Sequence, residues 1–522
     1  MGAPGASSDA RAWLAEADRL HHAKQFAPAV EHYRQALARD AASFDAWYGI
    51  GFAQSALHEH GAAIEAFCRA LALRPDATRL RINLAESLFA LGHVSEADRE
   101  YERAVAEGDP TAREMALRDI ACIVPGDPAM DNAAIMRVRR RWAAAESTSV
   151  RPCRPDRSPE TKPRIGYVSS FFGERNWMKM FMGVINAHDR DRFQVHLLAT
   201  GRLPSVEAGY RDHPDDRIWD IGDISNQQLA AHIADARLDV LIDLNGYSDL
   251  TRMPLLLHRA APVQLSWANM YATTGFPTVD CVVGDRWTIP PEEERFCVER
   301  VRRVPHTYLA FAVFYPVPDV APPPWPSAGH ITFGSLMSAY KITDQVIAAW
   351  SRILRGVPGS RLLLRNRALS HASNRADFLA RFAANGIDAA RLSLEGGGDH
   401  FDFLRSYDRI DIALDAFPYN GGTSTAEALW QGVPLLTFNG DRWASRTSRS
   451  ILMAAGLGDW VADDQPGFEA MAIRMGLAPE RLAAMRAGLR AKVAASPACD
   501  TGGLCRALEA IFRDEIMSRA IA

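Results

Sequence analysis

A strand, a glycine turn and a helix start follow one another in residues 411–434, DIALDAFPYNGGTSTAEALWQGVP. The apolar run DIALDAF is typical of a buried strand, and Gly421 and Gly422 allow the backbone to come close to a ligand. Thr423 and Ser424 begin a helix, whose free N–H groups and positive dipole end point out of the turn. The pattern predicts a binding site for a diphosphate. An ordinary strand–helix connection with a Thr or Ser N-cap is the alternative.

A lysine follows the first strand expected in the C-terminal half of the chain, in the segment FGSLMSAYKIT. At the carboxyl end of a parallel strand, the ammonium group of Lys341 could hold a phosphate as a point charge. A surface lysine without a function is the alternative. No Asp-x-Asp motif of the kind that holds a divalent ion follows an expected strand. We therefore expect no metal, and we expect the positive charge to come from Lys341 and the amides of residues 421–424.

The N-terminal part of the chain repeats with a period of 34 residues, the length of a tetratricopeptide (TPR) repeat. Small residues recur at fixed positions, with an aromatic residue three or four positions away on the same helix face. The matching positions are Trp13 and Trp47; Ala29, Ala63 and Ala97; Tyr33, Phe67 and Tyr101; and Ala36, Ala70 and Ala104. The pattern predicts three repeats of paired helices.

Two sets of short, apolar, β-rich segments follow the repeats and alternate with helical stretches. The alternation predicts parallel sheets with crossover helices, and the proline-rich stretch at 314–330 divides them into two Rossmann-like domains facing a cleft. The proline-rich residues 151–163 indicate a linker. The expected domains are three TPR repeats (8–110), a helical connector and linker (111–162), an N-terminal Rossmann-like domain on the acceptor side (163–320), a C-terminal Rossmann-like domain that binds the nucleotide (328–464) and C-terminal helices (465–522).

Composition and charge narrow the class of protein. The 522 residues are 48% hydrophobic and 23% charged, as in globular proteins, and the net charge of -4 argues against nucleic acid or a membrane as a partner. The first residues do not resemble a signal peptide, and no apolar run approaches the roughly 18 residues of a membrane span. The seven cysteines are scattered without a CxxC motif, so we expect a cytoplasmic protein with neither a disulfide framework nor a zinc site.

Several of these segments resemble the catalytic half of the O-GlcNAc transferase/SPINDLY family. They are TFGSLMSAYKITDQVIAAW, DIALDAFPYNGGTSTAEALWQGVPLLT and GDRWASRTSRSIL in the C-terminal half, and RIGYVSSFFG, DVLIDLNGYS and APVQLSW in the N-terminal half. The resemblance spans about residues 164–460 and implies a GT-B fold that needs no metal or other cofactor. It implies transfer of a sugar from a nucleotide-sugar, by preference a UDP-sugar, to a Ser or Thr hydroxyl of a protein held by the repeats.

The resemblance also implies roles for individual residues. Lys341 is expected at the diphosphate, with Gly421, Gly422, Thr423 and Ser424 at the helix start. Glu427 occupies the position of an acidic residue that binds the ribose, and His400 is expected on the same nucleotide-sugar side.

Residues on the acceptor side match the family less well. The histidines that usually follow the Phe-Gly of the N-terminal half are absent from residues 172–180, and Phe403 stands where a histidine usually precedes DIALDAF, three residues from His400. The turn at 269–273 also differs from the usual one. Glu174 and His306 are the candidates for the base, and Arg175, Thr273 and Thr274 are expected on the acceptor or sugar side. Arg175 could recognise an acidic sugar or form a surface ion pair.

Three functions therefore remain open. The first is a protein O-glycosyltransferase of the O-GlcNAc transferase/SPINDLY type. The second is a transferase that acts on a glycan or small molecule with a different sugar, and the third is a catalytically silent TPR scaffold. A homo-oligomer is an open alternative, because repeat domains often pair.

Overall fold

The computed structural model describes residues 8–146, 162–268 and 271–521. Most of the predicted linker, together with Asn269 and Met270 of the altered turn, lies outside the described residues. The chain forms two compact units. The first consists of Met1–Ala129 and Phe333–Phe403, and the second of Met130–Thr332 and Leu404–Ala522.

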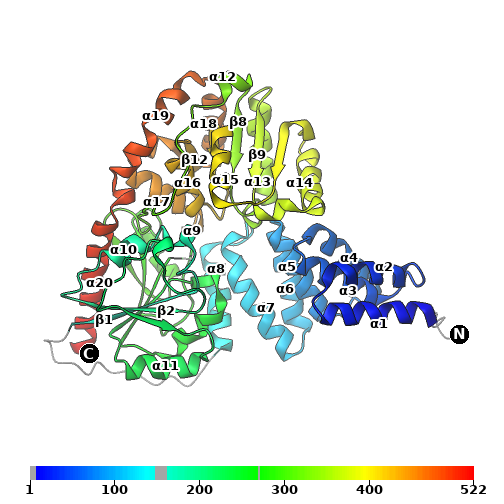
Figure 1. The fold of residues 1–522 in the computed structure, drawn as a ribbon, viewed down its shortest axis with the longest axis horizontal. Helices are drawn as coiled ribbons and strands as arrows, with labels where there is room; N and C mark the ends of the chain where they lie inside the picture. Colours follow the sequence, from blue (N-terminus) through cyan, green and yellow to red (C-terminus); the bar gives the residue numbers. More distant parts are fainter. Residues whose placement is uncertain (1–7, 147–161, 269–270, 522) are drawn as a thin grey trace. The chain divides into compact units, whose positions relative to one another are not determined.

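The first unit begins with helices stacked in pairs (Figure 1, blue to cyan). The pairs are α1 (Ser8–His22) with α2 (Phe26–Leu37), α3 (Phe44–Ala56) with α4 (His60–Leu73), and α5 (Thr78–Ala90) with α6 (Val94–Glu107), and α7 (Pro110–Ile123) packs on α6. Aromatic rings of one helix lie against glycines of the neighbouring helix: a Cβ on Gly49 would come within 2.3 Å of the Tyr33 ring, and one on Gly51 within 2.5 Å of the Phe67 ring. The predicted TPR-like helix pairs are confirmed, because close helix approach explains the recurring small and aromatic residues.

The second unit contains a seven-stranded parallel sheet in the order β3-β2-β1-β4-β5-β6-β7. The strands are β1 (Arg164–Ser169), β2 (Gln194–Ala199), β3 (Arg217–Asp220), β4 (Val240–Asp243), β5 (Val263–Trp267), β6 (Cys281–Asp285) and β7 (Arg300–Val304). The strand order reverses between β1 and β4, the point at which open α/β sheets bind ligands. The helices that accompany the sheet are α8 (Asn132–Ala145), α9 (Arg175–Met178), α10 (Met182–Asn186) and α11 (Asn226–Asp235).

A six-stranded sheet follows α12 (Trp325–Ala328), in the order β10-β9-β8-β11-β12-β13. Its strands are β8 (Thr332–Ser335), β9 (Arg361–Arg365), β10 (Leu392–Glu395), β11 (Ile412–Leu414), β12 (Leu435–Phe438) and β13 (Val461–Ala462). The helices between them are α13 (Asp344–Gly356), α14 (Ala372–Ala384), α15 (His400–Leu404), α16 (Thr423–Trp430) and α17 (Thr447–Ala454). The two predicted Rossmann-like domains are therefore confirmed, because both sheets alternate strands with helices.

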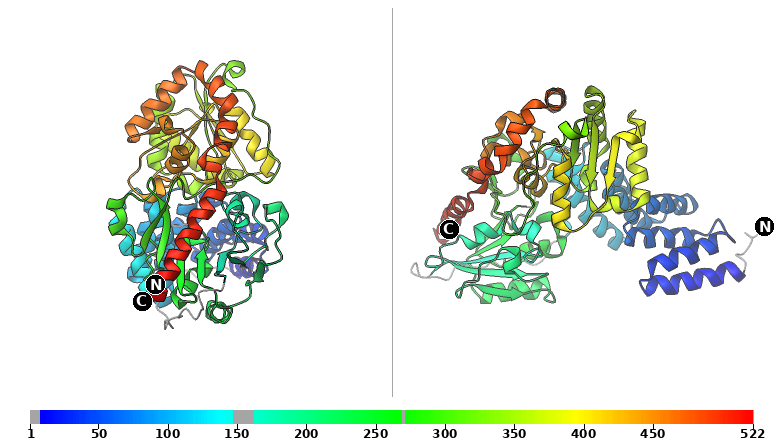
Figure 2. Two further views of the ribbon diagram at one scale, coloured as in Figure 1. Left: turned by 90° about the vertical axis from the view of Figure 1, so that its left-hand side faces the viewer. Right: turned by 45° about the horizontal axis from the view of Figure 1, so that its top comes forward.

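The chain ends in helices α18 (Gln465–Leu477), α19 (Glu480–Ala494) and α20 (Thr501–Ile521), as the sequence predicts. Helix α20 packs on α10 and on strands β5 and β7 of the seven-stranded sheet (Figure 2, red helix in the left view). No helix among the described residues is both long and apolar enough to span a bilayer.

A buried hydrogen-bond chain ties α20 to the first sheet. The Tyr167 hydroxyl lies 2.6 Å from Nε2 of His188, and Nδ1 of the same ring lies 2.9 Å from the Glu509 carboxylate of α20. Burial lowers the pKa of His188 below its usual 6.5, although Glu509 acts in the opposite direction. Burial alone would raise the pKa of Glu509, but its contacts with His188 bring that pKa below its usual 4.5. Burial in this chain of contacts therefore favours the neutral imidazole.

This chain of contacts predicts a loss of stability in mild acid. Because the pKa of folded His188 lies below that of the unfolded chain, its contribution is complete above about pH 6.5 and is lost as the pH falls through the lowered value. We expect the free energy of unfolding, measured by urea denaturation, to decline from about pH 7.5 to about pH 5 less steeply in His188→Gln than in the wild type. The control is His232→Gln on the exposed face of α11, which should keep the wild-type slope. Equal slopes in all three proteins would contradict the prediction.

Candidate active site

The glycine turn after β11 is held by one buried carboxylate. Asp415, which is 2% exposed, accepts hydrogen bonds through Oδ1 from the N–H groups of Ala416 and Gly421, each at 3.0 Å. Its Oδ2 accepts a bond of 2.6 Å from the hydroxyl of Thr437 on β12. The turn is thus attached to the neighbouring strand as well as to its own start. Asp415, the second aspartate of DIALDAF, is a functional candidate that sequence reasoning passed over.

Helix α16 begins directly after this turn, as predicted. Its N-cap is Gly422, with no side-chain hydrogen bond to the cap, so the alternative of a Thr- or Ser-capped helix start does not describe this structure. Thr423 and Ser424 are half-buried rather than enclosed. Because first-turn N–H groups have no acceptor within their own helix, this end can bind an anion. The diphosphate role of residues 421–424 remains a prediction.

The base of α16 is fixed from behind by hydroxyl groups. The Thr425 hydroxyl lies 2.7 Å from that of Ser448 on α17, and Ser448 donates a bond of 3.1 Å to the carbonyl of Gly421. The Tyr407 hydroxyl donates to the carbonyl of Ser424 at 3.1 Å. These bonds hold the turn and the first residues of the helix in place without occupying the helix N–H groups.

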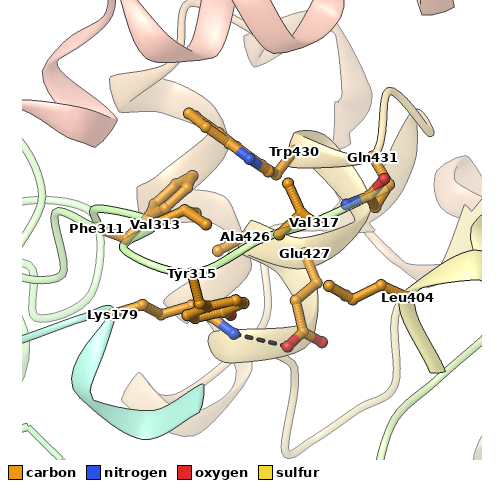
Figure 3. A pocket seen from close by; sticks show the side chains of 10 residues that line it. All are labelled: Lys179, Phe311, Val313, Tyr315, Val317, Leu404, Ala426, Glu427, Trp430 and Gln431. Carbon is orange, nitrogen blue, oxygen red and sulfur yellow. Dashed lines mark hydrogen bonds and ion pairs between the residues drawn. The ribbon is translucent and has the colours of Figure 1, made fainter. Parts of the chain in front are cut away.

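A buried ion pair connects α16 to the N-terminal Rossmann-like domain. The Lys179 ammonium lies 2.6 Å from the Glu427 carboxylate, and the two residues are 1% and 6% exposed. Lys179 also donates to the side-chain oxygen of Asn176. Figure 3 shows the pair at one side of a small pocket whose other lining residues, such as Tyr315 and Trp430, are largely apolar. Burial lowers the pKa of Lys179, whereas the carboxylate beside it acts in the opposite direction.

Lys179 is a candidate that sequence reasoning missed. It stands in the segment 172–180, which the sequence singled out only for its lack of histidine. The available signal was a lone lysine within Trp-Met-Lys-Met-Phe, because a charge in an apolar run is retained inside a protein only when it is paired. The predicted ribose-binding role of Glu427 stays a prediction, and a ribose would have to share this carboxylate with Lys179.

The carboxyl ends of β1 and β4 form a second polar cluster, at the point where the strand order reverses. The Asn245 side chain accepts a bond of 2.8 Å from the N–H of Ser170 and donates one of 3.1 Å to its hydroxyl. The Asp243 carboxylate accepts bonds from the N–H groups of Asn245 and Gly246. Burial raises the pKa of Asp243 to about 6. Such a cluster at a switch point is a natural place for an acceptor-side ligand.

The two candidates for the base lie in different surroundings. Glu174 is exposed and lies 3.8 Å from the exposed guanidinium of Arg202. His306 is also exposed and lines another pocket, together with Asp500 and Arg506. Neither residue lines the pocket that holds Lys179 and Glu427. The base role of each remains a prediction.

The predicted acceptor-side residues also divide. Arg175 is exposed, and its guanidinium lies 5.5 Å from the ring centre of Tyr315. Thr273 and Thr274 are buried, and both hydroxyl groups donate to the carboxylate of Glu299, which is itself buried. These contacts account for the two threonines as parts of the domain core, and a role at the acceptor stays a prediction.

Lys341 and His400 belong to the first compact unit, whereas Glu427 and residues 421–424 belong to the second. Lys341 ends the short 3₁₀ turn η6 (Ala339–Lys341) after β8, and its ammonium lies 5.8 Å from the ring centre of Tyr340. His400 begins α15, with its ring stacked on Phe403. The position of Lys341 at the carboxyl end of a strand is as predicted, and its pairing with the helix start of α16 stays a prediction.

Helical repeats joined to two Rossmann-like domains define a TPR-bearing protein of the GT-B class. A solved structure with this architecture, a mutant of the Thermobaculum terrenum O-GlcNAc transferase, is 25% identical, has a TM-score of 0.81 and covers 99% of both chains. The model of glycosyl transferase family 41 matches residues 151–312 and 326–508, and a tetratricopeptide repeat model matches residues 44–77. The chain belongs to glycosyl transferase family 41.

Two relatives from Arabidopsis thaliana show how far the similarity extends. A probable UDP-N-acetylglucosamine–peptide N-acetylglucosaminyltransferase, SPINDLY, is 30% identical over 366 residues, which are 69% of this chain and 40% of that protein. A second protein with the same enzyme name, SEC, is 28% identical over 349 residues, 65% of this chain and 35% of that protein. The chain therefore spans less than half the length of these relatives. The match to the family model confirms the predicted family resemblance.

The buried ion pair predicts the effect of removing one of its charges. Lys179→Met leaves the Glu427 carboxylate buried without its ammonium partner, so we expect the free energy of unfolding in urea to fall by about 3–5 kcal/mol. Lys179→Met combined with Glu427→Leu should recover most of this loss, because no unpaired charge then remains. The matched control is Glu174→Gln in an exposed pair, with a change below about 1 kcal/mol. A loss in Lys179→Met no larger than in this control contradicts the prediction.

Proposed function

We propose that this protein transfers a sugar from a nucleotide-sugar, by preference a UDP-sugar, to a Ser or Thr hydroxyl of a protein. Membership of glycosyl transferase family 41 supports this function, as do relatives named for transfer of N-acetylglucosamine from UDP to peptides. The observation that carries the proposal is the start of α16. A turn held by the buried carboxylate of Asp415 leads into a helix whose N-cap is Gly422. Glycine has no side chain that could occupy the first N–H groups of the helix.

The chemistry of the donor explains why such a helix start is useful. Breaking the bond between sugar and phosphate leaves a nucleoside diphosphate with additional negative charge, and this charge must be stabilised as it develops. The first N–H groups of α16 and the Lys341 ammonium would provide the stabilisation, and no metal would be needed. The one group of His, Cys and carboxylate side chains with metal-ligand spacing among the described residues is His188, Cys505 and Glu509, none of which belongs to the proposed donor site.

The acceptor would be a protein bound by the TPR helices and the cleft, and nucleic acid and membranes would not be partners. A reducing cytoplasm is the proposed location. The six cysteines among the described residues are all free, which fits that compartment. Self-association through the repeats is a further proposal.

The Lys179–Glu427 pair gives the second candidate function a specific basis. An ammonium group beside the carboxylate that is expected to bind the ribose would change what this part of the site recognises. A donor with a sugar other than N-acetylglucosamine, or an acceptor that is a glycan or small molecule, is therefore the second candidate. A catalytically silent TPR scaffold is the third function to be tested.

The donor site predicts a large effect of a single lysine. Purified protein is incubated with a panel of UDP- and GDP-sugars and cell extract as acceptor, and release of nucleoside diphosphate is followed. We expect Lys341→Ala to reduce the rate of release by about 10²–10³, the usual effect of removing one charge-stabilising donor. Lys492→Ala is the matched control. This exposed lysine donates to the backbone carbonyl of Gly456 and is not part of the proposed donor site.

The same experiment distinguishes the three functions. Sugar incorporated into protein, lost in Lys341→Ala, supports the proposed transferase. Release without incorporation into protein favours the second candidate. Binding of a nucleotide with no release from any donor favours the scaffold and rules out the proposed activity under these conditions.

A further inference from the structure

The segment that carries Lys341 is too short to fix the lysine by itself. η6 has three residues, and it joins the end of β8 to the start of α13. Loops of this kind are usually the mobile parts of a Rossmann-like domain. Catalytic groups, however, must be held within fractions of an ångström, because a shift of about 1 Å can cost about 100-fold in rate. The support for this segment must therefore come from elements packed against it.

The third TPR helix pair provides one such contact through its aromatic ring. Phe89, at the end of α5, stacks on Tyr340, with ring centres 5.1 Å apart and an angle of 28° between the planes. Both rings are half-buried. Tyr340 directly precedes Lys341, whose ammonium lies 5.8 Å from the centre of the Tyr340 ring, within the range of a cation–π interaction. The Phe89 ring of the repeat thus contacts the Tyr340 ring, which in turn lies beside the Lys341 ammonium.

The backbone of the same repeat approaches the same segment. Gly92, in the turn between α5 and α6, has a φ of +87°, and a Cβ at this position would lie 2.4 Å from the carbonyl oxygen of Ile342 and 3.0 Å from that of Ala339. The turn therefore touches the residues on both sides of Tyr340 and Lys341. Glycine is required here both by the left-handed conformation and by the close approach.

One largely buried arginine bonds to both sides of this contact. Arg381 on α14, whose side chain is 9% exposed, donates to the carbonyl of Leu91 in the repeat at 2.8 Å and to the carbonyl of Ile342 at 3.0 Å. The neighbouring Asp377 lies 3.0 Å from Nε2 of His93, in the same repeat turn. Because a guanidinium presents its donors in a rigid fork, Arg381 fixes the turn and the lysine segment relative to each other.

We propose that the third TPR helix pair is a positioning element of the donor site: Phe89 and Gly92, with Arg381, hold Lys341 in the place where it binds the diphosphate. The proposal rests on the function proposed above for Lys341. The repeats would then have two roles, to hold the acceptor and to position Lys341. The contacts of Phe89, Gly92 and Arg381 do not involve an acceptor, so the second role is independent of the first. Occupation of the repeats by a protein could then alter the affinity for the donor through the same contacts.

The test is a double-mutant cycle on nucleotide binding, which needs neither the natural acceptor nor the natural sugar. Dissociation constants of UDP, with GDP in a parallel series, are measured by calorimetry for the full chain. We expect Lys341→Ala to weaken binding by about tenfold or more, as for the loss of one charged contact. Phe89→Ala should weaken binding by about three- to tenfold, and it should have no further effect in the Lys341→Ala background.

Three further variants separate positioning from general damage. Gly92→Ala should reproduce the loss seen in Phe89→Ala, whereas Tyr340→Phe, which keeps the ring, should bind as the wild type does. Phe52→Ala, on α3 of the same repeat array, is the matched control and should leave binding unchanged. If Phe89→Ala lowers the melting temperature, Phe89→Leu, which keeps the apolar contact with less loss of volume, replaces it in the cycle.

The outcomes distinguish this proposal from the one on which it rests. Binding weakened by Lys341→Ala but not by Phe89→Ala or Gly92→Ala overturns the positioning role and leaves the donor site intact. Effects of Phe89→Ala and Lys341→Ala that simply add also overturn it, because the ring would then act elsewhere. Nucleotide binding that is unchanged in Lys341→Ala rejects the donor site itself, and the positioning role with it.

Discussion

The hydrogen bonds of the buried Asp415 carboxylate are the constraint on which the proposed donor site depends. A carboxylate with no access to water must have its oxygens occupied, and here they are occupied by N–H groups on both sides of the turn and by a hydroxyl of the next strand. This requirement sets the path of residues 416–421 and so the direction in which α16 begins. The helix can then leave its first N–H groups for a ligand, because the turn does not depend on them.

The Lys179–Glu427 pair shows what a buried charge requires of its surroundings. The Lys179 ammonium is fully buried, and a neighbouring carboxylate and an amide oxygen are needed to retain it there. The acidic residue expected to hold a ribose thereby gains a structural partner. The segment that departs from the family pattern, residues 172–180, is thereby joined by a direct contact to the helix of the proposed donor site.

The repeats and helix α14 are linked in a similar way in the first unit. Asn374 of α14 donates to the carbonyl of His58 and accepts from the N–H of Gly61, both at 2.9 Å, and thus binds the turn of the second repeat with one side chain. Arg381, two turns further along the same helix, binds the turn of the third repeat. Helix α14 therefore carries two polar anchors for the repeats, and the segment of Lys341 lies beside the second. An array of only three helix pairs gains a fixed orientation relative to its own unit from these bonds.

Local patterns were sufficient to predict the helix pairs, the two α/β domains and the turn that precedes α16. Three patterns can be read directly along the chain: the 34-residue period, the alternation of apolar segments with helices, and the glycines before a helix. None of them depends on which distant residues meet in the folded protein. The identity of the buried partners could not be obtained in this way. Lys179 and Glu427 are separated by 248 positions, and Phe89 and Tyr340 by 251, so only the folded chain brings each pair together. A lone lysine in an apolar run indicates that a partner exists, because a buried ammonium is retained only beside a group that compensates for its desolvation. Which carboxylate is that partner is decided by the packing of the tertiary structure.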